Sequence, residues 1–468
     1  MKAARLAPEK ILVLSFAAFI LAGALFLMLP SATTGKSISF VDALFTTTSA
    51  TCVTGLTVVD IGTYFSMFGQ IVVLISIQLG GIGIMTFSTF LLYVFGRRLT
   101  VRDSDLLTKT LGHTGGTTPK GLLWTVVVVS LLIEGTGAML LYSRFATDLP
   151  ADQALWSSVF HSVSAFCNAG FSTFSSNLMN YSADITVNTT IMLLIFLGGI
   201  GFIVFLELYQ FGLSQTRSFL DSLKQKRHAS YLAEAPFRFS IHSKVVITVS
   251  ILLIVLGAAA VGILEYNNVE KGMSVKERIL TSLFQSVTPR TAGFNTVDTG
   301  ALSDATLVIV VILMFIGASP GSTGGGIKTS TFAVLMGMIR STIGKKQRVT
   351  FYKRSVSALV QSEAVTLIFL AGGVVILGSL LVQMAEMANA SSVTAHGKYL
   401  ELLFETVSAF GTVGLSANVT PTLSTFSKYV LIIIMFIGRL GPLTLAVALS
   451  RRKVRTEFVY PEGRILIG

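Results

Sequence analysis

Charged side chains are scarce in this chain of 468 residues. Asp, Glu, Lys and Arg make up only 12% of it, whereas a soluble globular domain carries about 25%. Hydrophobic residues make up 52%, and the mean hydropathy is +0.75. This composition excludes an ordinary soluble domain and predicts a protein whose solvent is the lipid bilayer.

Cysteine and histidine are also scarce. The two cysteines, Cys52 and Cys167, are too few for a framework of disulfides, and no Cys/His spacing suggests zinc. A disulfide between neighbouring segments is conceivable, but two small buried thiols are the better interpretation. The apolar runs contain no convergent acids, histidines or cysteines, so we expect the protein not to be an enzyme.

Eight apolar runs predict an all-α integral membrane protein, because each is near the length that crosses a bilayer. A shorter, polar segment that contains glycine lies between the two members of each pair. The first run is not expected to be a cleaved signal peptide, because the polar stretch after it matches the later repeats. The runs are 11–29, 68–95, 122–142, 189–211, 245–264, 307–339, 364–382 and 429–449.

The short polar segments resemble one another and define four repeats. Each contains a Phe followed by a Gly ten residues later, or nine in the third repeat. A second glycine signal begins 24 to 28 residues further on, and close helix packing is the expected role of Gly80, Gly198 and Gly438. The predicted repeats are 1–112, 113–230, 231–350 and 351–468. The pairs are Phe45 and Gly55, Phe160 and Gly170, Phe284 and Gly293, and Phe404 and Gly414.

Basic residues predict the orientation. The termini and the segments between repeats hold 25 of the 35 Lys and Arg residues, and the alternate segments hold eight. The positive-inside rule therefore predicts cytoplasmic termini and four short segments on the outer side. The net charge of +12 is read as a topology signal, and no nucleic acid is expected as a partner.

The short segments have the composition of an ion filter. Irregular backbone at membrane depth must line a water-filled cavity, and four such loops around one axis present rings of carbonyl oxygens to a cation. The filter segments contain no acid, which favours a monovalent cation over calcium or magnesium. Nearby acids, Asp42, Asp60, Asp298 and Glu405, are expected to concentrate cations at the mouth. The predicted filter residues are Val53, Thr54, Gly55, Asn168, Ala169, Gly170, Thr291, Ala292, Gly293, Thr412, Val413 and Gly414.

The third repeat is interrupted in its second apolar run. Glycines and a proline there prevent a lipid-facing helix and predict a loop that blocks the pore beneath the filter. Repeats one, two and four are expected to continue as apolar helix at this level. A phosphate-binding loop is not expected, because Ile327 separates Gly326 from Lys328. The predicted gate comprises Ala318, Ser319, Pro320, Gly321, Ser322, Thr323, Gly324, Gly325, Gly326, Lys328 and Arg439.

Charged residues within the apolar runs include Arg439, Lys328 and Glu134. Arg439 has two open interpretations: it hydrogen-bonds the loop and places a positive barrier in the pore, or it pairs structurally with helix-end carbonyls. Lys328 is expected to extend toward the cytoplasm. Glu134 is expected to face a neighbouring helix or a dimer interface and has no predicted ion role.

The four filter segments and the glycine-rich loop resemble the Trk/Ktr/HKT superfamily of potassium transporters over nearly the whole chain, with the Ktr-type membrane subunit as the closest match. The resemblance implies four membrane–pore-loop–membrane repeats around one central pore, with the repeat-three loop as gate. It also implies a homodimer, a cytosolic nucleotide-binding ring and stimulation by sodium. Gly55 stands where some members carry Ser, which favours potassium. A secondary carrier remains an alternative, although its repeats are commonly inverted and these share one orientation.

Overall fold

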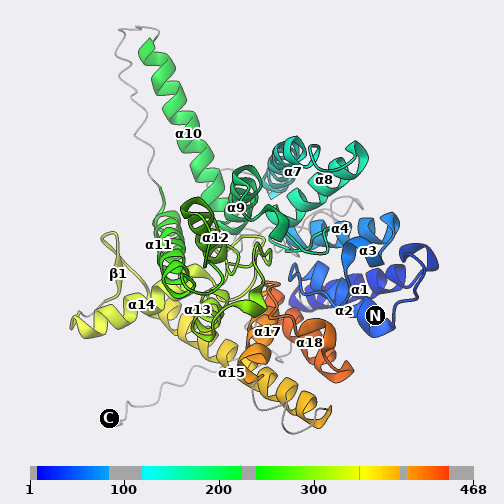
Figure 1. Ribbon diagram of the computed structural model, residues 1–468. Helices are drawn as coiled ribbons and strands as arrows, with labels where there is room; N and C mark the ends of the chain where they lie inside the picture. The colour runs from blue at the N-terminus through cyan, green and yellow to red at the C-terminus, as the bar shows by residue number, and fades with distance from the viewer. Residues whose placement is uncertain (1–7, 84–118, 224–238, 347, 390–397, 442–468) are drawn as a thin grey trace, which may run out of the picture.

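The computed structural model describes residues 8–83, 119–223, 239–346, 348–389 and 398–441 (Figure 1). Helices surround a common centre, and the blue first repeat lies beside the orange last one. Within the described residues, the only strands form a small antiparallel hairpin of β1 (Thr350–Phe351) and β2 (Arg354–Ser355).

Each quarter of the chain contributes a first helix, a short helix and a second helix. The first helices are α1 (Pro8–Leu27), α7 (Pro119–Phe145), α11 (Ile241–Leu264) and α15 (Ala358–Asn389). The short helices are α2 (Phe40–Thr51), α8 (Ala151–Phe166), α12 (Val275–Val287) and α17 (Tyr399–Gly411). The second helices are α4 (Met67–Gly81), α9 (Ile185–Gly199), α13 (Asp304–Phe315) and α18 (Thr425–Leu440).

Further elements connect or extend these helices. Helix α10 follows α9 and projects from the body, and α14 follows α13 (Figure 1). Single turns lie beyond the short helices or at the end of α1. The bounds are η1 (Pro30–Ala32), α3 (Ile61–Tyr64), η2 (Met179–Tyr181), α10 (Phe202–Leu223), η3 (Thr299–Ala301), α14 (Thr329–Ile343) and η4 (Thr420–Thr422).

Polar side chains fasten the two long helices of a repeat at one end. In repeat three Glu265, which caps α11, accepts hydrogen bonds from the backbone and hydroxyl of Ser303, the N-cap of α13. In repeat four Glu386 accepts from the backbone of Ser424, the N-cap of α18. Repeat two uses an ion pair of 2.5 Å between Arg144 and the N-cap of α9, Asp184. The two glutamate contacts satisfy N–H groups at helix N-termini that have no intrahelical acceptor.

The second helices are shorter than the apolar runs. In repeat two α9 ends at Gly199 and α10 begins at Phe202, with Gly201 at φ +93° between them. The expectation of continuous helix is therefore wrong for repeat two. At the same level α4 and α18 end, and the residues just beyond them, Gly83 and Gly441, also have positive φ. Glycine adopts this left-handed conformation without a Cβ clash, so it ends a helix cheaply.

Three of the four first helices have the length and apolarity to cross a membrane, whereas the apolar part of α1, Val13–Leu27, is shorter. Within the described residues, three helices qualify: Trp124–Phe145, Ile241–Leu264 and Ala358–Ala388. Helices α4, α9 and α13 are apolar but shorter. The chain thus has membrane-length helices as predicted, while each second helix ends within its apolar run. The ends of the runs in repeats one and four, 84–95 and 442–449, lie outside the described residues.

The second glycine signal packs the second helices of repeats one, two and four against their own short helices. A Cβ atom at Gly80, Gly198 or Gly438 would lie 2.0, 1.9 or 2.0 Å from a carbonyl oxygen near the C-terminus of α2, α8 or α17. No side chain fits at these distances. The predicted packing role of these glycines is confirmed.

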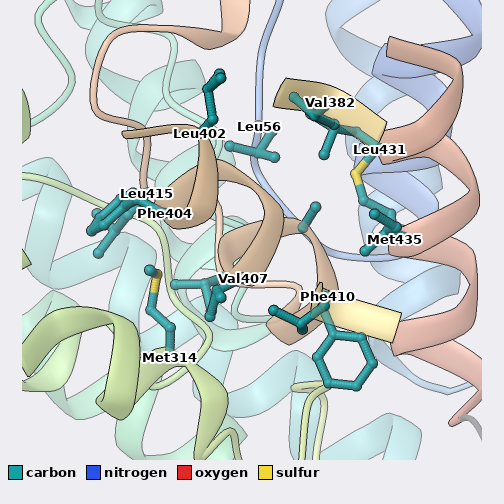
Figure 2. Close-up of a cluster of buried hydrophobic side chains, with 14 of the residues drawn as sticks. Leu56, Met314, Val382, Leu402, Phe404, Val407, Phe410, Leu415, Leu431 and Met435 are labelled. Carbon is teal, nitrogen blue, oxygen red and sulfur yellow. The ribbon is translucent and has the colours of Figure 1, made fainter. Parts of the chain in front are cut away.

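An apolar cluster supports the fourth short helix (Figure 2). Phe404 and Phe410 of α17 are buried among side chains of α13, α15 and α18. Leu56 of repeat one and Leu415 of repeat four belong to the same cluster, one residue after their respective filter glycines. The core therefore joins repeat four to repeat one beside the predicted filter.

Candidate functional site

The predicted filter residues meet at the C-terminal ends of the four short helices. All twelve are buried. The chain takes a left-handed conformation at each predicted filter glycine and also two residues earlier, at Val53, Asn168, Thr291 and Thr412, with φ between +50° and +69°. Positive φ is a genuine outlier for β-branched residues, and such strain persists only where the surrounding structure imposes it.

The four glycines form a closed ring. A Cβ atom at Gly55 would lie 2.3 Å from the carbonyl oxygen of Ala169, in the next repeat. The corresponding distance is 2.6 Å from Gly170 to Ala292 and 2.4 Å from Gly293 to Val413. Gly414 closes the ring, because its Cβ would lie 2.2 Å from the oxygen of Thr54 in repeat one. Only glycine permits each segment to approach its neighbour this closely.

Hydrogen bonds to the short helices orient the ring backbone. The N–H groups of Thr54, Ala169 and Val413 donate to the carbonyls of Ser49, Ser164 and Ser408 at 2.7, 2.7 and 2.9 Å. In repeat three Ala292 donates to Thr288 at 2.9 Å. In a trans peptide the N–H and C=O bonds point in opposite directions. The carbonyls that share these peptides therefore point away from the short helices; they belong to Val53, Asn168, Thr291 and Thr412.

The carbonyls that meet the neighbouring glycines around the ring, here called the ring carbonyls, accept no hydrogen bond among the described residues. Among the hydrogen bonds of the described residues, none ends on the carbonyl oxygen of Thr54, Ala169, Ala292 or Val413. Buried carbonyls are almost always paired. Four unpaired oxygens around one point can therefore replace the water shell of a cation.

A cavity of about 430 Å³ lies on one side of the ring. The four glycines form its floor, and Asp60 is the predicted mouth acid that lines it. Glu405 is not at the mouth: it is fully buried and accepts hydrogen bonds from Ser416, Ala417 and Thr420, so the prediction for it is wrong. Asp42 pairs with Lys428 at 2.7 Å, and Asp298 accepts from Asn418 at 2.8 Å.

The predicted gating loop lies against the ring's opposite side. A Cβ atom at Gly324 would lie 2.0 Å from the hydroxyl oxygen of Thr291, and one at Gly325 would lie 2.3 Å from that of Thr412. These threonines precede the ring glycines, whereas the cavity is lined by the glycines and residues after them. The ring thus lies between the cavity and the loop.

Backbone hydrogen bonds hold the loop to repeat two and to its own base. Ser319 and Thr323 donate to the carbonyls of Gly199 and Gly198, at the broken end of α9. Ala318 donates to Gly325 at 3.3 Å and closes the loop. Pro320, Gly321, Ser322 and Gly326 complete the segment, none of it helical.

Two cations hold loop carbonyls. The guanidinium of Arg439 donates to the carbonyls of Thr323 in the loop and Gly80 at the end of α4. The hydrogen bonds of both interpretations are present, since Arg439 bonds the loop and a helix end together, and the positive barrier in the pore stays a prediction. The ammonium of Lys328 donates to Gly324 at 2.7 Å. Its predicted extension toward the cytoplasm is wrong, because the loop offers nearer oxygens.

Cys52, Cys167 and Glu134 are buried. Cys52 and Cys167 are buried and free, as predicted. Glu134 faces a neighbouring helix, as predicted, and accepts from Gln78 of α4 at 3.0 Å. Within the described residues, no group of three His, Cys, Asp or Glu side chains could hold a metal ion.

Buried hydroxyls behind the ring were not predicted from the sequence. Each is the fourth residue after the Phe of its repeat, and that shared position was the available signal. They are Ser49, Ser164, Thr288 and Ser408.

Comparison with known proteins identifies the family. The family model described as TrkH, cation transport protein, matches residues 7–455. The chain belongs to this family. The TrkH family consists of transport proteins, so the chain is a multi-pass membrane transport protein and not an enzyme. The predicted relationship to Trk and Ktr proteins is confirmed.

Curated relatives of this TrkH-family chain match nearly its whole length. The Ktr system potassium uptake protein B of Bacillus subtilis is 37% identical over 99% of this chain and 97% of its own. The potassium/sodium uptake protein NtpJ of Enterococcus hirae is 31% identical over 99% and 98%. The crystal structure of the potassium transporter TrkH from Vibrio parahaemolyticus has a TM-score of 0.65, with 21% identity over 96% of this chain and 86% of that chain. At this identity the structural match supports the fold alone.

Proposed function

We propose that this protein takes up potassium across the cytoplasmic membrane through the ring of four glycine segments. The observation that carries the proposal is the closed ring of unpaired carbonyl oxygens from four repeats of one chain. Relatives at 37% and 36% identity are named potassium uptake proteins. One relative is named for potassium and sodium, and sodium is accordingly proposed as a second ion.

The donor set supports a weakly hydrated monovalent cation. The ring offers backbone oxygens and no carboxylate, and Glu405 directs its carboxylate into a buried hydrogen-bond set instead. Calcium and magnesium sites depend on carboxylates or retained waters. Potassium loses its water shell more readily, so a ring of carbonyls is sufficient for it.

We expect this chain to restore potassium accumulation in cells that lack potassium uptake. The measurement is the initial rate of uptake at low external potassium, with and without a soluble nucleotide-binding partner. Potassium should flow along its own gradient, because the ring and the cavity form a pore. A coupled carrier is commonly built of inverted repeats, whereas these four repeats share one orientation. Strict dependence on a second ion's gradient would favour a coupled carrier and contradict the pore proposal.

The gate and the partners form a second layer of the proposal. The loop from Ala318 to Gly326 closes the path beneath the ring, and its hydrogen bonds to α9, Arg439 and Lys328 support this role. A homodimer controlled by a cytosolic nucleotide-binding ring rests on the family resemblance. The four predicted repeats, 1–112, 113–230, 231–350 and 351–468, supply one quarter of the path each.

Both termini are proposed to be cytoplasmic. The bias of 25 basic residues against eight supports this orientation. A reporter fused after Gly468 should be active only in the cytoplasm, and a cysteine introduced beside Gly35 should react with a membrane-impermeant reagent added outside. Reaction of the C-terminal reporter with external reagent in intact cells would contradict this topology.

A further inference from the structure

One hydroxyl per repeat lies directly behind the ring. These hydroxyls belong to the last turns or C-caps of the short helices, and all four are fully buried. Each residue also accepts, through its backbone carbonyl, the N–H of the residue before its ring glycine. The residues are Ser49, Ser164, Thr288 and Ser408.

In repeats one and four the hydroxyl binds the ring glycine itself. The N–H of Gly55 donates to the Ser49 hydroxyl at 3.1 Å, and that of Gly414 donates to the Ser408 hydroxyl at 3.1 Å. The N–H of each glycine shares a planar trans peptide with the preceding carbonyl. Holding the N–H against the short helix therefore directs the oxygens of Thr54 and Val413 into the ring.

In repeats two and three the hydroxyl has a different partner. Ser164 donates to the carbonyl of Phe171 at 2.8 Å, and Thr288 donates to that of Phe294 at 2.5 Å. Both carbonyls belong to the residue after the ring glycine. These two hydroxyls fix the chain where it leaves the ring, through the carbonyls of Phe171 and Phe294.

We propose that Ser49 and Ser408 are specificity-determining positioning residues that aim two of the four ring carbonyls at the ion. The inference rests on the proposed filter function and adds side chains to a filter built otherwise of backbone. Without the hydroxyl, the buried glycine N–H has no acceptor, which is costly. The peptide then turns toward another acceptor and carries the Thr54 or Val413 oxygen out of the ring.

The test is the ratio of potassium to sodium uptake in Ser49→Ala and Ser408→Ala, at matched amounts of folded protein. We expect the ratio to fall by about tenfold, which corresponds to about 1.4 kcal/mol. Ser49→Thr and Ser408→Thr should keep the wild-type ratio, because threonine retains a hydroxyl oxygen that can accept the glycine N–H. Ser49→Cys offers a weak acceptor of similar shape and should also lower the ratio.

Ser158→Ala is the matched control. Ser158 is fully buried in the short helix α8, and its hydroxyl donates to Ala154 of the same helix at 2.6 Å. Its ratio should not change. An equal loss in Ser158→Ala or Ser164→Ala, or no loss in Ser49→Ala and Ser408→Ala, would overturn the inference while leaving the filter proposal standing. A wild-type protein without preference for potassium would instead contradict the proposed function.

Discussion

Replacing Gly414 by serine should lower the ratio of potassium to sodium uptake by at least about tenfold, the equivalent of about 1.4 kcal/mol. The Cβ atom would lie 2.2 Å from the carbonyl oxygen of Thr54 and 2.9 Å from the Cα of Gly55. Both neighbours are backbone, so the ring must widen or shift. The φ of +94° adds strain of about 1–2 kcal/mol for a residue with a side chain. Ion uptake by purified protein in vesicles measures the ratio directly.

Gly272→Ser separates strain from displacement of the ring. Gly272 has a similar φ of +84°, but a Cβ atom there would meet nothing within 4 Å. This variant should keep the wild-type ratio and lose only a little stability. A folded Gly414→Ser protein with unchanged selectivity, beside an unchanged Gly272→Ser protein, would mean that the glycine ring is not the filter.

Removing the tether of the gating loop should raise potassium flux in the absence of any partner subunit. Arg439→Ala deletes the hydrogen bonds to Thr323 and Gly80. Bonds to charged groups contribute about 1.5–3 kcal/mol each, so even one such loss shifts a closed-to-open equilibrium by about tenfold or more. Deleting residues 321–324 should act in the same direction, because Gly324 lies against Thr291 beneath the ring and Thr323 carries the carbonyl that Arg439 holds. The measurement is uptake at matched expression.

Arg439→Lys distinguishes a tether from an electrostatic barrier. Lysine keeps the charge but lacks the planar fork that reaches two carbonyls in fixed geometry. If the loop is held mechanically, the lysine variant should conduct nearly as well as the alanine variant. Flux that stays at the wild-type level in the loop-deleted, correctly folded protein would show that this loop is not the gate.

The ring could be predicted from the sequence because the spacing from Phe to Gly recurs in four repeats. A single Gly55 would be read as a packing residue, but four glycines at one spacing from a Phe point to a shared position around an axis. The loop was accessible because Pro320 and its neighbouring glycines exclude helix in an apolar run. The low content of charged residues and the high mean hydropathy were sufficient to predict a membrane protein.

Other features depend on contacts that spacing does not encode. The break after Gly199 was not predicted, because an apolar run that contains glycines is still typical of a helix. In the structure Gly198 packs against Phe166, and the loop donates hydrogen bonds to the carbonyls at the end of α9. Glu405 looked like a surface acid because its three partners, Ser416, Ala417 and Thr420, come from the far side of the turn. Lys328 was misjudged for the same reason, since its acceptors are created by the folded loop.

The closure of Gly414 onto Thr54 within one chain has an evolutionary consequence. In a channel made of four identical subunits, every substitution is present in all four filter segments at once. Here each substitution alters one segment while three stay as they were. A single substitution therefore changes ion preference through one of four segments. The four segments can also diverge, and one equivalent position already differs among the repeats, as Val53, Asn168, Thr291 and Thr412.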